Sequence, residues 1–432
     1  MPGAPQLQRR HIVAVTLGNA LEFYDFGVYA FFSIQIGHTF FPAQSAYGSL
    51  MLSLATFGAG FVTRPIGAFF IGNFADRVGR RAAMMLCFVL MGVAIISLAL
   101  IPGYATIGVA APILAVLARL LQGFSLGGEI GSNTAYLSEA ARPDNRGMVV
   151  SWQSASQGIA LVFGGLCGVA ITALLPPPAL DAYGWRIAFL LGAVTVPFGL
   201  WLRMGLPETL HAPEPQTTVA QSSDQQPDTR LDLARRHWRI FVVGLTYLSS
   251  GTIATYIFTY IVTYAQSSIH LAARVGFIAS TLGTLLGIPV AVLSGWASDR
   301  CGRRPLLILG NLVFLAMIYP MFAWIAAERS SLSFIIGLSV LRVLFSIPVG
   351  AFYAALAESI PKSIRGSGFG ITYSVAIAAF GGTTQLVVTW LIHVTGNPVA
   401  PAWYLTGAAA IGQIALFLMP ESAPVKLAAR QS

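Results

Sequence analysis

The chain has 432 residues, of which 56% are hydrophobic and only 9% charged, and its mean hydropathy is +0.72. A water-soluble protein of this length needs far more charge to cover its surface, so the composition excludes an ordinary soluble domain and indicates a membrane protein. The net charge of +9 comes from short basic clusters between apolar runs, without interleaved aromatic residues, which argues against a nucleic-acid partner.

Apolar runs of about 20 residues follow one another along the chain, and each is long enough to cross a lipid bilayer as a helix. We predict an all-α polytopic membrane protein with twelve transmembrane helices joined by short loops. The predicted spans are 12–38, 47–72, 82–101, 105–138, 147–174, 185–205, 239–265, 274–297, 305–326, 331–358, 367–393 and 401–420.

One polar stretch interrupts this pattern. Residues 208–236 are rich in Gln, Pro, Ser and Asp, which predicts a cytoplasmic linker between a six-helix bundle at 1–207 and a second one at 237–432. Of the 25 Lys and Arg residues, 19 fall on the side of the membrane that holds this linker and both termini. Because basic loops face the cytoplasm, we expect a multi-pass protein of the bacterial inner membrane with both termini cytoplasmic.

The two halves contain an internal repeat. Residues 72–81 read GNFADRVGRR and residues 295–304 read GWASDRCGRR, in the predicted loops after spans 2 and 8, at an offset of 223. The same offset relates Arg119 to Arg342 and Gly127 to Gly350. The repeat therefore predicts two pseudo-symmetric six-helix bundles with the same orientation.

The duplicated G-x-x-x-D-R-x-G-R-R segment resembles the most specific motif of the major facilitator superfamily, and the resemblance covers essentially the whole chain. Three further motifs resemble the metabolite–proton symporter family: Asn19-x-x-Glu22-x-x-Asp25-Phe26, Arg64-Pro65-Ile66-Gly67 and Arg119-Leu-Leu-Gln122-Gly123-Phe-Ser125. Two other stretches look like bacterial citrate and tricarballylate symporters, namely Tyr136-Leu-Ser-Glu139 and WQSASQ at 152–157. The resemblance implies the fold of that superfamily and alternating access.

Six ionisable residues lie inside the predicted spans, although a charge at the bilayer centre costs about 2.5–3.5 kcal/mol on insertion scales. They are Glu22, Asp25, Arg64, Arg119, Glu129 and Arg342. One interpretation is that the acids and arginines are paired braces between helices. The other is that they line a transport path.

The acids are candidates for proton coupling. Glu22 and Asp25 share one helical face, and two like charges that close disfavour ionisation of both, so one of them can take up a proton. We predict proton coupling by Asp25, Glu22 and Glu129, with Asp25 as the main carrier. In related sugar–proton symporters an acid of span 1 pairs with an arginine of span 4, and the resemblance gives these roles to Asp25 and Arg119.

The arginines are candidates for substrate binding, because the planar guanidinium binds a carboxylate bidentately. Tyr256 and Tyr260 belong to a polar stripe on span 7, for which interhelical hydrogen bonding is the alternative. The predicted substrate-binding residues are Asn19, Arg64, Arg119, Gln122, Tyr256, Tyr260 and Arg342.

The repeated motif implies a pair of gates by its resemblance to the superfamily. Asp76 and Asp299 would each face the N-terminus of a helix in the opposite half, where the helix dipole favours an anion. Arg80 with Glu139, and Arg303 with Glu358, would form the accompanying ion pairs. The alternative is that all of them are ordinary positive-inside loop charges.

No HExxH, CxxC, P-loop or G-x-S-x-G pattern supports enzyme or ATPase chemistry, so we expect no enzyme, no metal and no cofactor. We predict a monomeric symporter, driven by the proton gradient, that imports an organic tricarboxylate, citrate or tricarballylate. Alternatives are a symporter for another organic acid or osmolyte (α-ketoglutarate, shikimate or betaine) and a non-transporting membrane metabolite receptor. The linker and the short tails offer no signalling segment for such a receptor.

Overall fold

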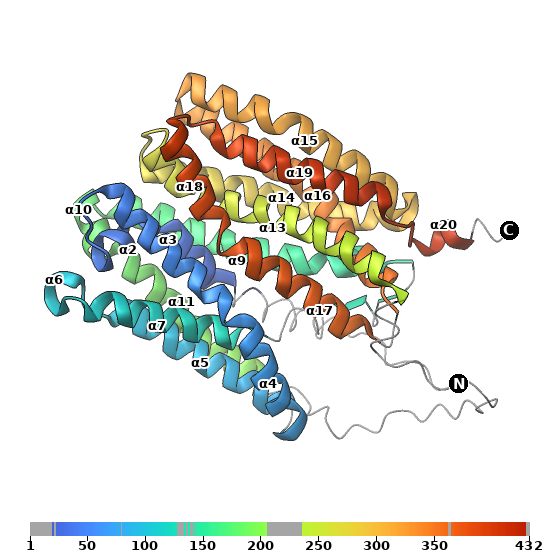
Figure 1. Cartoon of the computed structure of the whole chain (residues 1–432), viewed down its shortest axis with the longest axis horizontal. Helices are drawn as coiled ribbons and strands as arrows, with labels where there is room; N and C mark the ends of the chain where they lie inside the picture. The colour runs from blue at the N-terminus through green and yellow to red at the C-terminus, as the bar shows by residue number, and fades with distance from the viewer. Residues whose placement is uncertain are drawn as a thin grey trace.

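The computed structural model describes residues 23–78, 80–127, 144–204, 236–361 and 364–428, with residues 20, 134, 137, 138, 141 and 142 (Figure 1). Regular structure in this part of the chain is helical, with no strand. Among the described residues, eight stretches are long and apolar enough to cross a membrane: Ala46–Ile71, Arg146–Leu174, Trp238–Ser267, Ala273–Cys301, Arg303–Glu328, Ser331–Ser359, Gly368–Thr395 and Ala400–Leu418.

We call the helices before residue 205 the first half and those after residue 235 the second half. The first half contains a helix at 23–31, α2 (Ser33–Phe40), α3 (Ala46–Val62), α4 (Arg64–Val78), α5 (Arg80–Leu100), α6 (Tyr104–Ile107), α7 (Ala110–Ser125), α9 (Arg146–Leu174), α10 (Pro177–Ala179), η1 (Leu180–Gly184) and α11 (Trp185–Met204). The second half contains α13 (Trp238–Ser267), α14 (Ala273–Cys301), α15 (Arg303–Glu328), α16 (Ser331–Ser359), α17 (Arg365–Ala376), η3 (Ile377–Gly381), α18 (Thr384–Thr395), α19 (Ala400–Leu418) and α20 (Pro424–Ala428).

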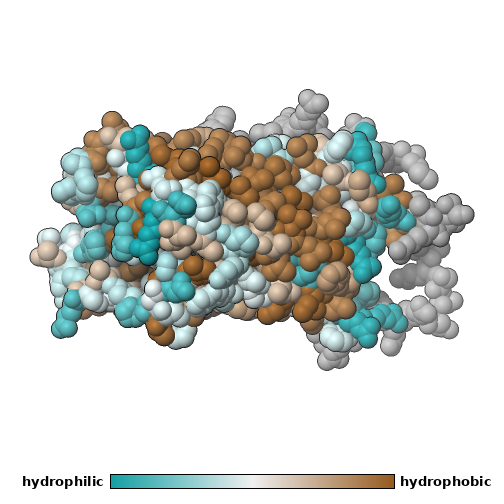
Figure 2. All heavy atoms as spheres, turned by 90° about the horizontal axis from the view of Figure 1, so that it is seen from above, coloured by the Kyte–Doolittle hydropathy of each residue, from teal (hydrophilic) through white to brown (hydrophobic). Residues whose placement is uncertain are grey.

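The helices have the length and the surface of membrane spans. The 30 residues of α13 extend about 45 Å at a rise of about 1.5 Å per residue, which exceeds a hydrocarbon core of about 30 Å. Large apolar side chains such as Leu174, Val194 and Leu309 are more than 60% exposed. Figure 2 shows an apolar band between two more hydrophilic ends of the molecule. The prediction of an all-α membrane protein is confirmed.

The repeated motif is more helical than the sequence predicts, since α4 continues to Val78 and α14 to Cys301. The predicted loops at 72–81 and 295–304 are therefore wrong. In the second copy only Gly302 separates α14 from α15, with φ at +98°, a conformation that glycine adopts without a steric penalty. Asp299 consequently lies within the last turn of a helix rather than in a loop.

Two other predicted spans are less regular in the structure than a single α-helix. Span 4, predicted at 105–138, contains α6, a turn at 108–109, α7 and a turn at 126–127, and its described residues 134, 137 and 138 are helical again. Span 11, predicted at 367–393, consists of α17, the π-helical η3 and α18, with a break at 382–383. Hydropathy detects an apolar run but not a change of helical pitch within it, which explains the second difference.

Equivalent glycines pack equivalent helices in the two halves. A Cβ atom added at Gly127, just after α7, would overlap the backbone of Ala68 on α4. A Cβ atom added at Gly350 on α16 would overlap the carbonyl of Ala291 on α14. Both glycines, and both of their partners, are related by the sequence offset of 223. Small residues allow close approach of membrane helices, and here the repeat preserves that contact in both halves.

The two halves meet along several helices. In the second half α14 packs on α16, and across the halves it packs along α9, which also touches α16. On another side of the molecule α3 contacts η3 and α18 (Figure 1). These cross-half contacts surround a central cavity.

Candidate functional site

A cavity with about 1100 Å³ of empty space, including the part open to solvent, lies between the two halves. Its wall comes from the helix at 23–31, α3 and α9 of the first half, and from α13, α14, α16, α17 and η3 of the second. Most of the wall is apolar or aromatic, as is usual for small-molecule sites. The polar part includes Ser154, Gln157, Thr252, Thr255, Tyr256, Thr259, Thr284, Arg342, Ser346, Tyr353 and Tyr373.

Arg342 is the only arginine among the described residues of the cavity wall. Its guanidinium carbon lies 5.2 Å from the centroid of the Phe258 ring and 5.8 Å from that of Phe345. Its Nη1 atom is buried and has no hydrogen-bond partner within the described part of the chain. Aromatic rings therefore support the cation while a donor stays available for a carboxylate.

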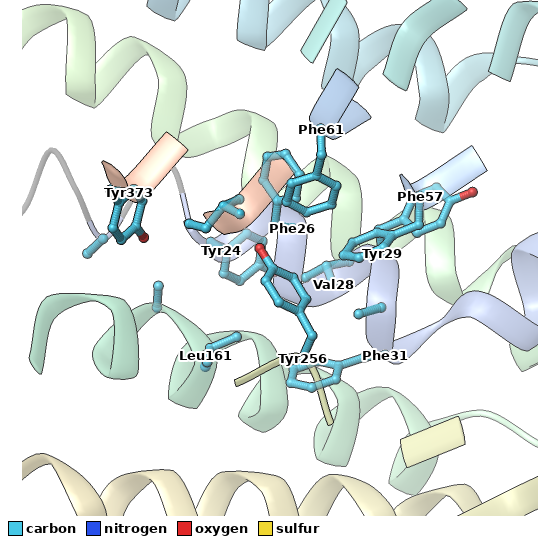
Figure 3. Close-up of a cluster of buried hydrophobic side chains, with 14 of the residues drawn as sticks. Tyr24, Phe26, Val28, Tyr29, Phe31, Phe57, Phe61, Leu161, Tyr256 and Tyr373 are labelled. Carbon is cyan, nitrogen blue, oxygen red and sulfur yellow. The ribbon is translucent and has the colours of Figure 1, made fainter. Parts of the chain in front are cut away.

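Four aromatic side chains, Phe26, Phe57, Phe61 and Tyr256, form what we call the aromatic layer. The Tyr256 ring on α13 lies 5.3 Å from Phe61 and 6.0 Å from Phe57, both on α3, measured between centroids. Phe26 lies 5.4 Å from Phe61, and Figure 3 shows Tyr256 reaching toward this pair. Phe26, Phe57 and Tyr256 also line the cavity, so the aromatic layer is part of its wall.

Arg64 and Arg119 do not line the cavity, because they pack against the aromatic layer. The Arg119 guanidinium carbon lies 4.7 Å from the Phe26 centroid, and that of Arg64 lies 4.6 Å from the same ring. Arg119 is fully buried and donates a hydrogen bond to Gln122 Oε1. The structure therefore brings Arg64, Arg119 and Gln122 together one side chain behind the wall, rather than at the wall itself.

Asp25 and Arg119 form a buried contact pair. Oδ2 of Asp25 lies 3.9 Å from Nη1 of Arg119, and the two side chains are 2% and 0% exposed. Neither Asp25 oxygen, nor Nε or Nη2 of Arg119, has a hydrogen-bond partner among the described residues. Each member of the pair thus keeps unused hydrogen-bonding capacity. Asn19, Glu22 and Glu129, also predicted from the sequence, lie outside the described residues.

The two tyrosines of the polar stripe on α13 have different surroundings. Tyr256 lines the cavity, whereas Tyr260 is 1% exposed and does not. The Tyr260 hydroxyl accepts a hydrogen bond from Thr389 on α18 at 2.9 Å, and Gln385 of the same helix donates to Thr259 at 3.1 Å. This part of the stripe therefore makes interhelical hydrogen bonds, which was the alternative interpretation.

Asp299 has the contact expected of a gate residue. Its carboxylate accepts hydrogen bonds from the backbone N–H groups of Gly147 (2.8 Å) and Met148 (3.0 Å), in the first turn of α9 from the opposite half. An N-terminal helix turn presents free N–H groups and a positive dipole end to an anion. The contact joins α14 to α9 at one end of the cavity.

Arg303 connects Asp299 to a second acid. Its Nη1 lies 2.7 Å from Asp299 Oδ1, and its Nη2 and Nε lie 3.0 Å and 3.2 Å from the two Glu358 oxygens. The Arg303 side chain is fully buried, and that of Glu358 is 4% exposed. The Arg303–Glu358 pair is thus a bidentate ion pair, the strongest geometry for these groups.

Sequence reasoning missed two partners of this network. Arg146 of the first half lies 3.6 Å from Glu358 of the second half. Glu421 accepts hydrogen bonds from the backbone N–H groups of Arg303 and Arg304 at 2.9 Å and 3.0 Å, at the start of α15. Both residues belong to repeated positions, since Arg146 matches Arg365 and Pro420-Glu421 matches Pro207-Glu208. The repeat was the available signal.

The first copy of the gate is described only in part. The backbone of Asp76 lies in α4 and that of Arg80 begins α5, but their side chains lie outside the described part of the structure. Glu139 lies outside it altogether. The described residues also contain no group of three or more His, Cys, Asp or Glu side chains that could hold a metal ion.

The halves also meet at the opposite end of the cavity. The rings of Tyr47 on α3 and His393 on α18 stack with centroids 3.8 Å apart and an interplanar angle of 13°. Phe277 on α14 packs against Phe32 of the first half at 5.2 Å. Between these ends, Gly58 on α3 approaches Gly382 so closely that an added Cβ would lie 2.8 Å from the Gly382 carbonyl oxygen.

A membrane-embedded helical bundle with duplicated halves, a central cavity between them and cross-half contacts at both ends is the architecture of a secondary transporter. The chain belongs to the Major Facilitator Superfamily, whose sequence profile matches residues 15–383. The prediction of twelve transmembrane helices in the fold of this superfamily is confirmed, and the protein is a transporter and not an enzyme.

Named relatives cover almost the whole chain. The chain is 38% identical over 411 residues to the citrate-proton symporter of Salmonella typhi, covering 94% of this chain and 93% of the relative. It is 31% identical to the glycine betaine/proline/ectoine/pipecolic acid transporter OusA of Dickeya dadantii, covering 96% and 84%. A solved D-xylose-proton symporter has the same fold, with a TM-score of 0.75 at 18% identity, covering 96% and 98%.

Proposed function

We propose that the protein is a proton-coupled symporter that imports citrate, or a closely related tricarboxylate such as tricarballylate, by alternating access. The observation that carries this proposal is the 38% identity, over 94% of the chain, to a citrate-proton symporter. The cavity supports it, because Arg342 offers an unpaired donor to a carboxylate and Ser, Thr and Tyr hydroxyl groups line the same cavity. Tyr256 is the second predicted substrate-binding residue in the wall.

Proton coupling is assigned to the pair behind the aromatic layer. When Asp25 is ionised it holds Arg119, and when it is protonated that attraction is lost. Phe26 contacts the Arg119 guanidinium and also lines the cavity. Protonation of Asp25 can therefore alter the cavity wall through a movement of this one side chain. Any such coupling is reciprocal, so bound substrate must favour protonation as much as protonation favours substrate. Glu22 and Glu129 are the remaining candidates for the carrier.

The other predicted substrate contacts belong to a different state of the transport cycle. Arg64, Arg119 and Gln122 can reach a substrate only when the aromatic layer has moved, because its rings cover both guanidinium groups. Because Arg342 is not covered in this way, we assign the initial carboxylate contact to it. Asn19 remains a candidate contact through the motif that it shares with Glu22 and Asp25.

The Asp299 network is assigned to the closed cytoplasmic gate. Its cross-half contacts, from Asp299 to α9 and from Glu358 to Arg146, must break for α9 and α14 to separate at that end. By duplication, Asp76, Arg80 and Glu139 form the second gate against the N-terminus of α17. The bundles at 1–207 and 237–432 then rock about the cavity, joined by the linker at 208–236.

The remaining assignments follow from charge and composition. The asymmetry of Lys and Arg supports an inner-membrane protein with both termini cytoplasmic, in direct contact with lipid along its apolar band (Figure 2). The two halves of one chain pack against each other around the cavity and together supply its wall, so we assign transport to a monomer. The proton gradient is the driving force, and no cofactor takes part.

A zwitterionic osmolyte is the second candidate substrate. The described cavity wall carries one arginine and many aromatic rings, among them Phe26, Phe57 and Phe345. A single carboxylate would suit Arg342, and a quaternary ammonium would suit aromatic faces. The 31% identity to an osmolyte transporter points the same way, but it is lower than the identity to the citrate-proton symporter.

Counterflow in proteoliposomes tests the proposal. Vesicles that contain the purified protein are loaded with one unlabelled compound: citrate, tricarballylate, α-ketoglutarate, shikimate or glycine betaine. Each batch is diluted into radiolabelled citrate and, in a parallel series, into radiolabelled glycine betaine. We expect transient accumulation of citrate only in vesicles loaded with a tricarboxylate. Accumulation of labelled betaine, with none of citrate, would reject the tricarboxylate assignment. Vesicles with Arg342→Gln protein serve as the matched control.

A further inference from the structure

The Gln157 side chain on α9 is a part of the cavity wall that the proposed function does not use. Its Nε2 atom is buried and has no hydrogen-bond partner among the described residues. The carboxamide also interacts with the side chain of Tyr373 on α17, which lines the same cavity, but an amide nitrogen carries two N–H groups and Tyr373 engages at most one of them. Buried polar groups in native proteins are nearly always hydrogen-bonded, so a free donor at a cavity wall needs an explanation such as a ligand.

Gln157 and Arg342 lie on either side of one short segment of α14. Gly158, the residue after Gln157, packs on Thr284 and Ile288, where an added Cβ would lie 2.9 Å from the Ile288 side chain. On the other side, an added Cβ at Gly283 would lie 3.2 Å from Arg342 Cβ. The cavity wall between them includes Thr284 and Ile288. Two unused donors therefore face one cavity from different halves of the molecule.

We propose that Gln157 anchors a second carboxylate of the same substrate molecule whose first carboxylate is held by Arg342. This assignment rests on the proposed transport of tricarboxylates. A neutral amide donor suits the second position, because it hydrogen-bonds carboxylate oxygens without adding a second buried cation. Such a cation would be left buried and unpaired when the substrate leaves, which is energetically costly.

The two anchors come from opposite halves, and this has a consequence for transport. A substrate with two carboxylates bridges α9 and α16, so its binding favours the state in which the halves are close around the cavity. A compound with one carboxylate can engage Arg342 but cannot also engage Gln157. Gln157 thus selects polycarboxylates over zwitterions such as betaine, and it links substrate binding to movement of the halves.

The test is equilibrium binding of radiolabelled citrate, tricarballylate and glycine betaine to purified protein. Gln157→Leu keeps the size of the side chain but removes the donor, and Gln157→Glu replaces the donor with a carboxylate. We expect both variants to bind both acids about 10- to 100-fold more weakly than wild type, as for a hydrogen bond to a charged group. Gln266→Leu, the same change at the far end of α13 outside the cavity, should retain wild-type affinity.

The outcomes separate the two proposals. Wild-type affinity in Gln157→Leu and Gln157→Glu overturns the role of Gln157 while leaving tricarboxylate transport intact. A loss for citrate alone also overturns it, because tricarballylate lacks only the hydroxyl group and the contact would then be to that hydroxyl. If wild type binds neither acid but binds betaine, the proposed function itself fails. Each variant is first shown by size-exclusion chromatography and thermal unfolding to be folded like wild type.

Discussion

The Arg119 guanidinium lies 3.9 Å from the Asp25 carboxylate, and both side chains are shut off from solvent. The aromatic layer separates this pair from the cavity that contains Arg342, since Phe26 touches Arg119 on one side and lines the cavity on the other. In this state the candidate proton site and the candidate substrate site are therefore neighbouring but separate. Two predictions test how these sites work together, and two more test the gate.

Asp25→Asn should separate exchange from accumulation. Asparagine resembles the permanently protonated acid and cannot carry a proton, so the variant should keep citrate exchange within a few-fold of wild type. Uphill uptake driven by a pH gradient should fall to the level of empty vesicles. The measurement is exchange and gradient-driven uptake of radiolabelled citrate in the same proteoliposome preparation.

Glu22→Gln is the matched control for this experiment, because it makes the same chemical change three residues earlier in the chain. We expect it to retain most gradient-driven uptake. An Asp25→Asn protein that still concentrates citrate against its gradient would show that Asp25 is not the carrier, and Glu22 or Glu129 would then be examined.

Arg342→Lys should weaken citrate binding about 10- to 100-fold, because an ammonium group cannot make the bidentate contact of a guanidinium. Arg342→Gln should weaken it further. Arg119→Lys should behave differently, with a smaller effect on binding in this state and a larger one on gradient-driven uptake, since Arg119 lies behind the aromatic layer. Citrate binding by isothermal titration and gradient-driven uptake are measured for Arg342→Lys and Arg119→Lys. Equal losses of binding in the two variants would contradict the placement of Arg119 outside the substrate site.

Asp299→Asn should weaken the closed gate. The variant loses the negative charge that the N-terminus of α9 stabilises, and with it the ion pair between Asp299 and Arg303. Together these interactions contribute about 1–3 kcal/mol. A change of this size lowers the equilibrium constant between the closed and open states about 5- to 150-fold. Cysteines placed near Ser154 report accessibility from the cytoplasmic side, where labelling should become faster. Unchanged labelling rates would remove Asp299 from the gate.

Gly295→Ala should open the same gate by steric contact alone. An added Cβ would lie 2.5 Å from the Gly147 carbonyl oxygen and 2.8 Å from Ser151 Cβ, so α14 and α9 would have to separate. We expect faster cytoplasmic labelling and slower exchange. Gly407→Ala is the control, because nothing lies within 4 Å of its added Cβ and alanine favours a helix by about 0.5–1 kcal/mol. Equal behaviour of the two variants would refute the close-contact explanation.

Much of the fold and some of the candidate site could be predicted from local patterns. The long apolar runs and the offset of 223 predicted the helices and the duplication, and the equivalent packing of Gly127 and Gly350 agrees with them. The contact of Asp299 with the N-terminus of α9 was implied by the resemblance of the repeated motif to the superfamily. The repeat marks Arg146 and Glu421 as repeated positions, but it does not say which distant group each one contacts, so their partners Glu358 and the backbone of Arg303 were missed.

Composition and periodicity along the chain are sufficient to predict that it spans a membrane and is built from two related halves. Which buried charges lie in the same compartment depends on the packing of distant helices and is visible only in the folded molecule. Arg119 and Arg342 occupy equivalent positions of the repeat, yet Arg342 lines the cavity while Arg119 lies behind the aromatic layer. The physical reason is that the neighbours of each guanidinium come from other helices, and those neighbours differ between the halves.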